Sequence, residues 1–199
     1  MHIAILTFDG FNELDSLIAL GILNRIKQPG WRVSLAAPSE TVTSMNGVTL
    51  HRQARLEEID LFDAVLVGSG SKTREIAQDP DIMQWLARLD PARQLIGAQC
   101  SGTLLLAKAG LLAGIPGCTD LTTKPWVQDA GIEVLEQAFF ARGNLATAGG
   151  CLASIYLAAW TLARLVGREA AAQALHYVAP VGEKEAYVTR ALGHVEAYL

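Results

Sequence analysis

Short apolar runs alternate along the chain with longer segments whose apolar residues recur every three or four positions. A short apolar run between turn residues predicts a buried strand, and the spacing of three and four predicts a helix. We therefore predict strands over residues 2–8, 31–37, 63–71, 93–99, 117–120, 132–141 and 144–149. We predict helices over residues 12–26, 72–89 with a break before Pro80, 101–114, 125–131, 151–167, 168–178 and 183–199.

Two hairpins are predicted in addition. The segment TVTSMNGVTLHRQ is centred on Asn46-Gly47, a dipeptide that favours the tight turn of a hairpin. Arg142-Gly143-Asn144 separates the last two strands, which predicts that these strands pair with each other.

Strands that alternate with helices predict a mostly parallel sheet with helices on both faces. The length of 199 residues suits one α/β domain over residues 1–199. In such sheets ligands bind at the carboxyl ends of the strands. Three segments at those ends are therefore candidate site loops: Asp9–Asp15, Gly68–Lys72, and Cys100 with its neighbours.

Composition and charge exclude several partners. The formal net charge is -4 and the basic residues are scattered, which argues against nucleic acid or a membrane surface as a partner. The longest apolar run, residues 151–167, contains Arg164 and is short for a membrane span. The N-terminus leads directly into a strand without a basic leader. The three cysteines have no disulfide or metal-ligand spacing, so we expect a cytoplasmic protein with no metal.

Cys100 is the main candidate for chemistry, because it joins a predicted strand to a predicted helix between Ala98 and Gly102. Small residues at these two places are needed in a nucleophile elbow, where a strained turn presents a reactive side chain. The helix N-terminus would lower the pKa of the thiol, and the Ser101 N–H would stabilise an oxyanion. The alternative is a small buried residue that fits a tight corner.

Asp15 lies on an apolar helical stripe with Ile18, Ile22 and Ile26. A carboxyl group there is expected to be partly buried and to hold a proton, as a general acid requires. The alternative is a helix-start residue favoured by the helix dipole, a role that Glu13 fits better.

Gly70 follows the third predicted strand, so its N–H can approach a ligand closely and complete an anion site with the Ser101 N–H. The alternative is a plain loop glycine.

The sequence resembles the DJ/PfpI (ThiJ/PfpI) superfamily, in particular its isocyanide hydratase-like branch. CSGTLLLAKAGLLAG is similar to the elbow and following helix of that family, and GFNELDSLIALGIL to its first loop and helix. VGSGS is similar to its Gly-Gly loop, with Ser69 in place of the usual first glycine, and QDPDIMQWL and LHYVAP also match the branch. The resemblance implies a flavodoxin-like three-layer sandwich, a homodimer, no cofactor, and an Asp15 that faces Cys100.

The histidines depart from the family pattern. Protease-like members have a histidine directly after the cysteine, where this chain has Ser101, and many members have one at the position of Asp120. None of the four histidines lies at either position, so a Cys–His dyad is not expected. Asp120 is then either a second acid near the sulfur or a polar strand-end residue. Trp126 either walls the pocket or packs in the core.

The resemblance implies an enzyme similar to isocyanide hydratase that acts on a small-molecule substrate. The Cys100 thiolate would attack the terminal isocyanide carbon while Asp15 supplies a proton, and water would then release an N-formamide. Ser101 and Gly70 would provide N–H donors, and the Ser101 hydroxyl would position the acid.

Two alternatives remain open. In the first, the protein has no enzymatic activity and Cys100 is an oxidisable sensor, with the oxidised sulfur stabilised by Asp15 and the helix N-terminus. In the second, the protein has another hydrolase or amidase activity of the family. Cys118 and Cys151 are expected to be structural, although Cys151 follows Gly149-Gly150 near the expected cleft and is a candidate redox partner.

Overall fold

Seven strands form one sheet in the order β5-β2-β1-β6-β7-β9-β8 in the computed structural model, which describes residues 1–199. The strands are β1 (His2–Leu6), β2 (Arg32–Ala37), β5 (Ala54–Arg55), β6 (Ala64–Val67), β7 (Leu95–Gln99), β8 (Phe139–Arg142) and β9 (Leu145–Ala148). Neighbouring strands are parallel except β8, which pairs antiparallel with β9 at one edge. The predicted mostly parallel sheet is confirmed.

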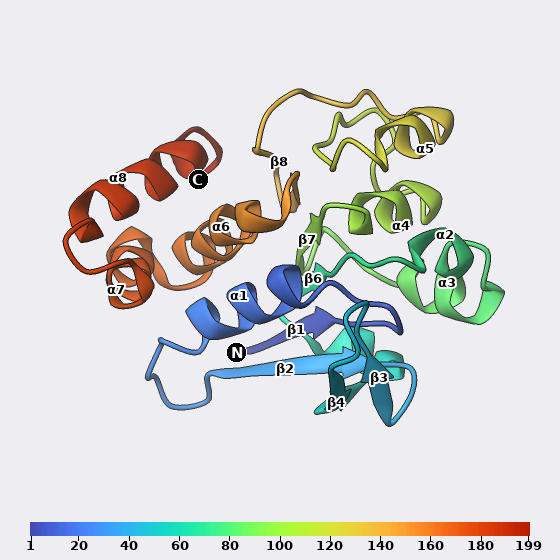
Figure 1. The fold of residues 1–199 in the computed structure, drawn as a ribbon, viewed down its shortest axis with the longest axis horizontal. Coiled ribbons are helices and arrows are strands. Elements are labelled where there is room, and N and C mark those ends of the chain that lie inside the picture. Colours follow the sequence, from blue (N-terminus) through green and yellow to red (C-terminus); the bar gives the residue numbers. More distant parts are fainter.

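Helices cover both faces of the sheet, as Figure 1 shows. One face carries α1 (Glu13–Leu23), α6 (Ser154–Val166), α7 (Arg168–Val178) and α8 (Lys184–Val195). The other side carries α2 (Thr73–Ile76), α3 (Pro80–Leu86), α4 (Gly102–Lys108) and α5 (Lys124–Asp129). The short 3₁₀ helices are η1 (Leu56–Leu61), η2 (Cys151–Ala153) and η3 (Glu196–Tyr198). No helix combines the length and the apolar character that a membrane crossing requires.

The sheet lies between two apolar cores, because alternate residues of a strand point to opposite faces. In β1, Ile3 and Ile5 belong to the core beneath α1 and α6, whereas Ala4 and Leu6 belong to the core beneath α3 and α4. Both sides of β1 are therefore buried, which explains its continuous apolar sequence. The result is the flavodoxin-like three-layer sandwich that the family resemblance implies.

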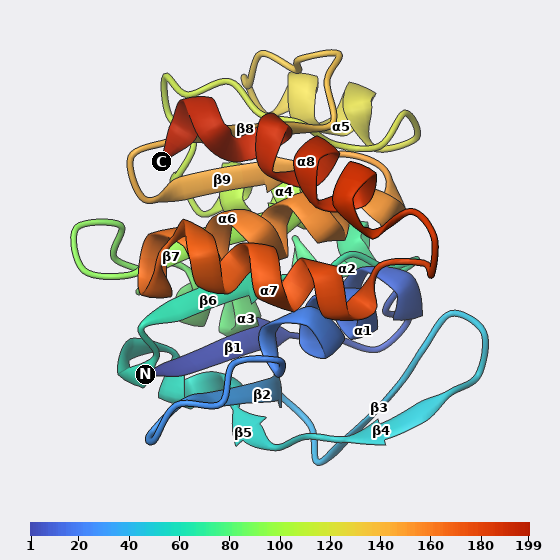
Figure 2. The same ribbon diagram turned by 90° about the vertical axis from the view of Figure 1, so that its left-hand side faces the viewer.

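Both predicted hairpins are confirmed. Strand β3 (Thr41–Thr43) pairs with β4 (Thr49–His51) in a separate two-stranded sheet. This β3–β4 hairpin projects beyond the main sheet at the lower right of Figure 2. The turn at Gly143 joins β8 to β9.

Some boundaries differ from the prediction for local reasons. Helix α4 ends at Lys108 rather than near residue 114, because Gly110 adopts a φ of 79°, in the left-handed region that terminates helices. The predicted strand 117–120 is wrong, because Gly117 makes only an isolated bridge, to Val134. In the predicted strand 132–141 only the end joins the sheet, as β8.

The loop between β1 and α1 holds the candidate site segments together. Phe11 forms bridges both to the β3–β4 hairpin and to Gly70. The Asn12 N–H donates to the Ser69 carbonyl at 2.8 Å. A Cβ at position 70 would lie 2.4 Å from the Gly10 carbonyl oxygen, so Gly70 is required by this close approach of the two loops.

The start of α4 lies directly against the end of β6. A Cβ at position 102 would lie 2.5 Å from the Val67 carbonyl oxygen and 2.9 Å from that of Gly68. Both obstacles are backbone atoms that cannot rotate away. Gly102 therefore allows the approach of helix and strand that sets the position of Cys100.

Replacing Gly102 with alanine is expected to destabilise the protein by about 1–3 kcal/mol, because the added methyl group overpacks this contact. Gly21 in α1 is a matched control, since no atom lies within 4 Å of the place of its Cβ. The Gly21→Ala variant should be neutral or slightly more stable. Urea unfolding of both variants checks the expectation, and equal stability of the two would contradict it.

Candidate active site

Cys100 occupies the sharp turn between β7 and α4. Its φ is 48°, and it is the only non-glycine residue with a positive φ. Such a conformation is unfavourable for a residue with a Cβ and is typically found where the surrounding structure enforces it at a functional site. The Cys100 N–H donates to the Ala148 carbonyl of β9 at 2.8 Å, which ties the turn to the sheet. The cysteine elbow predicted from the sequence is present.

Asp15 lies in the first turn of α1 and is 2% exposed. The Ser69 hydroxyl donates a hydrogen bond to Asp15 Oδ2, while Asp15 Oδ1 is buried without a hydrogen-bond partner. Burial raises the pKa of Asp15 to about 6, although the hydrogen bond from Ser69 acts in the opposite direction. The acid is therefore held by Ser69, which replaces the usual loop glycine, and not by the Ser101 hydroxyl.

Three side chains converge at this point. The ligand atoms of Asp15, Cys100 and Cys151 all lie within 4.8 Å of one another. Burial raises the pKa of the Cys100 thiol, and the neighbouring Asp15 carboxylate raises it further. This direction is opposite to the lowering expected from the helix N-terminus, because the sulfur is buried next to an acid.

Amide groups contact both sulfurs. Gln99 Nε2 lies 3.5 Å from Cys100 Sγ and also donates to the Gly150 carbonyl at 2.8 Å. Asn12 Nδ2 donates to Cys151 Sγ at 3.1 Å. With Asp15 the two sulfurs form a set of three metal-ligating atoms, one fewer than the four protein ligands of a structural zinc site.

The Gly70 loop and the start of α4 are joined by a small network. The Gly70 N–H donates to Ser101 Oγ at 3.2 Å, and Ser101 Oγ lies 2.7 Å from Thr73 Oγ1. Thr73 Oγ1 in turn donates to the Gly70 carbonyl at 2.9 Å. The Gly70 N–H is thus engaged by the Ser101 hydroxyl in the free site, whereas the Ser101 N–H donates to no acceptor of the chain.

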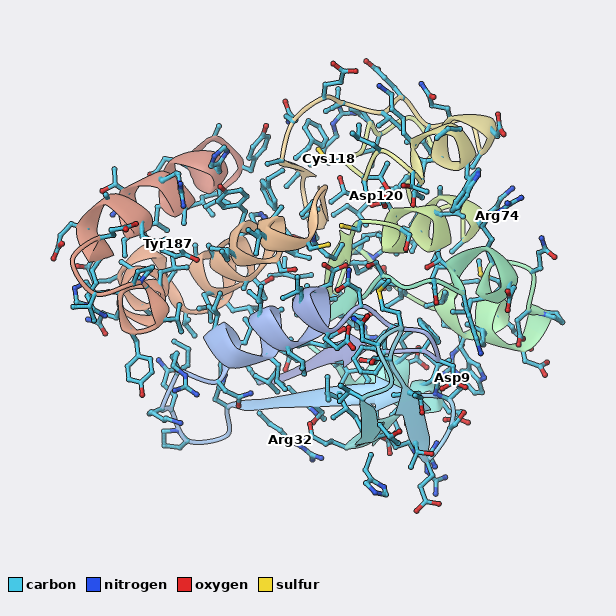
Figure 3. All side chains as sticks on the ribbon, in the orientation of Figure 1. Asp9, Arg32, Arg74, Cys118, Asp120 and Tyr187 are labelled. Carbon is cyan, nitrogen blue, oxygen red and sulfur yellow. The ribbon has the colours of Figure 1, made fainter.

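Asp120 and Trp126 both line the cavity beside Cys100. Asp120 Oδ1 accepts a hydrogen bond from the Thr123 N–H at 2.9 Å, so the side chain also organises the turn before α5. Asp120 lies in the loop between α4 and α5, and Arg74 lies on α2 (Figure 3). The Arg74 guanidinium stacks 4.6 Å from the centre of the Trp126 ring.

The cavity has a volume of about 320 Å³ and holds no histidine. Its lining residues are Asn12, Met45, Ser69, Gly70, Ser71, Cys100, Ser101, Asp120, Thr122, Thr123, Trp126 and Cys151. No histidine is therefore among the residues that line the cavity beside Cys100. Sequence reasoning missed Asn12 and the role of Ser69. A serine stands where the family usually has a glycine, and this difference could have pointed to a side-chain role for Ser69.

The site therefore belongs to the class of α/β proteins that carry a cysteine at a strand-to-helix elbow. Here the elbow lies at the carboxyl edge of a flavodoxin-like sheet and faces a buried acid. The chain belongs to the DJ-1/PfpI family, whose model matches residues 1–164. It is 26% identical over 147 residues to deglycase TK1284 of Thermococcus kodakarensis, covering 72% of this chain and 87% of that protein. It is also 26% identical over 130 residues to isonitrile hydratase of Pseudomonas putida, covering 65% of this chain and 57% of that protein.

Solved structures of the family share the fold. The structure of Schizosaccharomyces pombe DJ-1 has a TM-score of 0.79 and 16% identity, covering 90% of this chain and 100% of that one. The structure of Drosophila melanogaster DJ-1beta has a TM-score of 0.76 and 21% identity, covering 89% and 96%. These likenesses establish the fold and leave the chemistry to the residues of the site.

Replacing Asp15 with asparagine is expected to stabilise the protein above about pH 6. The pKa of Asp15 rises from its ordinary 3.8 to about 6 on folding, so ionisation of the carboxyl opposes folding. This opposition grows as the pH rises from about 4 to about 6 and reaches at most about 3 kcal/mol. The asparagine carries no charge and can still accept the hydrogen bond from Ser69. Urea unfolding at about pH 4 and about pH 8 measures the difference.

Glu13→Gln is the control for that experiment. The Glu13 carboxylate accepts hydrogen bonds from Ser44 and Asn46, and these hold the pKa of Glu13 below its ordinary value. Its ionisation therefore favours folding, so Glu13→Gln should lose stability relative to the wild type as the pH rises. An Asp15→Asn gain that is the same at both pH values would show that burial does not disfavour the Asp15 carboxylate.

Proposed function

We propose that the protein is a cysteine-dependent enzyme that hydrates an isocyanide to an N-formamide, with Cys100 as nucleophile and Asp15 as acid and base. The observation that carries the proposal is the buried Asp15 carboxyl, with a pKa of about 6, beside the elbow sulfur in a cavity without histidine. The likeness to isonitrile hydratase of Pseudomonas putida supports this reaction class.

The two groups share one proton over the neutral range. Below about pH 6 both Asp15 and Cys100 are protonated. Above it the pair retains a single proton, because burial and the adjacent carboxylate raise the pKa of Cys100. Asp15 Oδ1 has no other hydrogen-bond partner, so it is free to receive the thiol proton when the sulfur attacks.

The reaction then needs only this one proton and a water. The Cys100 sulfur bonds to the terminal isocyanide carbon, and Asp15 delivers the proton to that carbon, which gives a thioimidate. Water adds across the C=N bond, with its oxygen on carbon and a proton on nitrogen. The C–S bond breaks and the N-formamide leaves. The hydroxyl proton passes by way of Asp15 to the sulfur, which restores the Cys100 thiol and the Asp15 carboxylate.

The remaining groups position the reactants. The Ser101 N–H has no acceptor in the chain and would stabilise negative charge that develops on the substrate. The Gly70 N–H would join it only when the Ser101 hydroxyl turns away. Asp120 lies at the wall of the cavity and would act on polar groups of the substrate. A cavity of about 320 Å³ suits a small molecule.

Two wider features belong to the proposal. We propose a cytoplasmic location, because the three cysteines are free thiols. We also propose a homodimer, which sedimentation of the purified protein tests by its molar mass.

Activity on a simple alkyl isocyanide is expected to depend on both groups. Cys100→Ala should abolish formamide production, and Asp15→Asn should lower kcat/KM by about 10²–10⁴-fold, the usual contribution of a general acid or base. Cys118→Ala serves as a cysteine control and should retain activity, because Cys118 does not line the cavity. No turnover by the wild type would remove the proposal. Turnover of a glycated amino acid instead would favour an activity of the deglycase type named for the Thermococcus relative.

The pH dependence of kcat/KM should reflect the proton that Asp15 and Cys100 share. We expect kcat/KM to rise about tenfold per pH unit below about pH 6 and to level off above it, as the Asp15–Cys100 pair loses its first proton. A pH-rate profile of the wild type measures this. A profile that instead falls through about pH 6 would mean that Asp15 must enter the reaction protonated together with the thiol.

A further inference from the structure

Cys151 has no part in the proposed hydration, yet it lies in the reaction site. It lines the cavity, it is half-buried, and its sulfur is within 4.8 Å of both the Cys100 sulfur and the Asp15 carboxylate. The third cysteine, Cys118, is fully buried outside the cavity. Cys100 and Cys151 therefore both lie beside Asp15, whereas Cys118 does not belong to this group.

The segment that carries Cys151 is linked to the segment that carries Cys100. Cys151 begins η2 directly after Gly150, whose φ is 89°. The Gln99 amide contacts the Cys100 sulfur and holds the Gly150 carbonyl at 2.8 Å. Gly150 is in open space, since no atom lies within 4 Å of the place of its Cβ, and glycine adopts other backbone conformations at low cost.

We propose that Cys100 and Cys151 form a reversible disulfide when the site meets a peroxide. A disulfide requires a sulfur–sulfur distance of about 2.05 Å. The two sulfurs start no more than 4.8 Å apart, so rotation of the side chains and a small shift at Gly150 would close the gap. This inference does not depend on the identity of the hydration substrate.

The chemistry balances with a peroxide as oxidant. The Cys100 sulfur attacks one peroxide oxygen, the O–O bond breaks, and the other oxygen leaves as water or an alcohol with the thiol proton. Cys100 becomes a sulfenic acid. Cys151 then attacks the Cys100 sulfur and gives its proton to Asp15. The S–S bond forms, the S–O bond breaks, and hydroxide takes the proton from Asp15 and leaves as water. A dithiol returns both cysteines to thiols by exchange.

Neighbouring groups favour the second step. The Asp15 carboxylate lies within 4.8 Å of the Cys151 sulfur and is ionised above about pH 6, so it can accept the thiol proton. The Asn12 amide donates to the Cys151 sulfur at 3.1 Å, which stabilises the thiolate that attacks. The disulfide would stop sulfur oxidation before the sulfinic acid, which thiols cannot reduce.

Peptide mapping can test the proposal directly, because trypsin places each cysteine on its own peptide. Cys100 lies on 94–108, Cys118 on 109–142, since Pro125 blocks cleavage after Lys124, and Cys151 on 143–164. The wild type, Cys151→Ser and Cys118→Ala are treated with hydrogen peroxide, alkylated and digested without reduction.

The wild type and Cys118→Ala should both yield peptide 94–108 joined to peptide 143–164, with the loss of two hydrogens, and dithiothreitol should separate them. Cys151→Ser should instead accumulate Cys100 with two or three added oxygens that dithiothreitol does not remove. The proposal is overturned if wild-type Cys100 gains those oxygens as fast as in Cys151→Ser. It is also overturned if the two peptides are joined only between chains, as non-reducing electrophoresis would show. Neither readout depends on turnover of an isocyanide.

Discussion

The confinement of the Asp15 carboxyl beside the Cys100 thiol, away from water, is the constraint on which the site depends. Burial disfavours the charged form of each group, and a charge on one disfavours a charge on the other. The pair consequently holds one proton in the neutral range. In the reaction that we propose, this pair would activate the sulfur and later protonate the substrate, and no imidazole would be needed.

The fold enforces this approach through backbone contacts. Gly102 brings α4 against the end of β6, and Gly70 brings its loop against Gly10 in the first loop. Ser69, in that second loop, then reaches the acid. The carboxyl ends of three parallel strands thus meet where the binding rule for open α/β sheets places a ligand. The strained conformation of Cys100 lies at this junction, where the Ala148 carbonyl accepts a hydrogen bond from the Cys100 N–H.

In the two reactions that we propose, the second sulfur would connect catalysis with oxidation. A thiol placed to attack an electrophilic carbon is also placed to attack a peroxide, so the proposed nucleophile would be open to oxidation. Cys151 shares the same carboxylate and lies in the same cavity. The two thiols and Asp15 thus form one cluster, in which the proposed small-molecule reaction and the proposed redox reaction would use the same proton acceptor.

The sequence by itself determined the features that arise from local pattern. The apolar strands, the Asn46-Gly47 hairpin, the break before Pro80 and the cysteine elbow were all predictable, because periodicity and turn residues act over a few neighbours. The burial of Asp15 was also predictable, from the apolar stripe on its helix. Tertiary structure alone decided that Ser69 holds the acid, that the Cys151 sulfur lies within 4.8 Å of Cys100 and Asp15, and that the pKa of Cys100 rises. These depend on segments distant in sequence, since the desolvation of a charge and the distance between two side chains are set by everything packed around them.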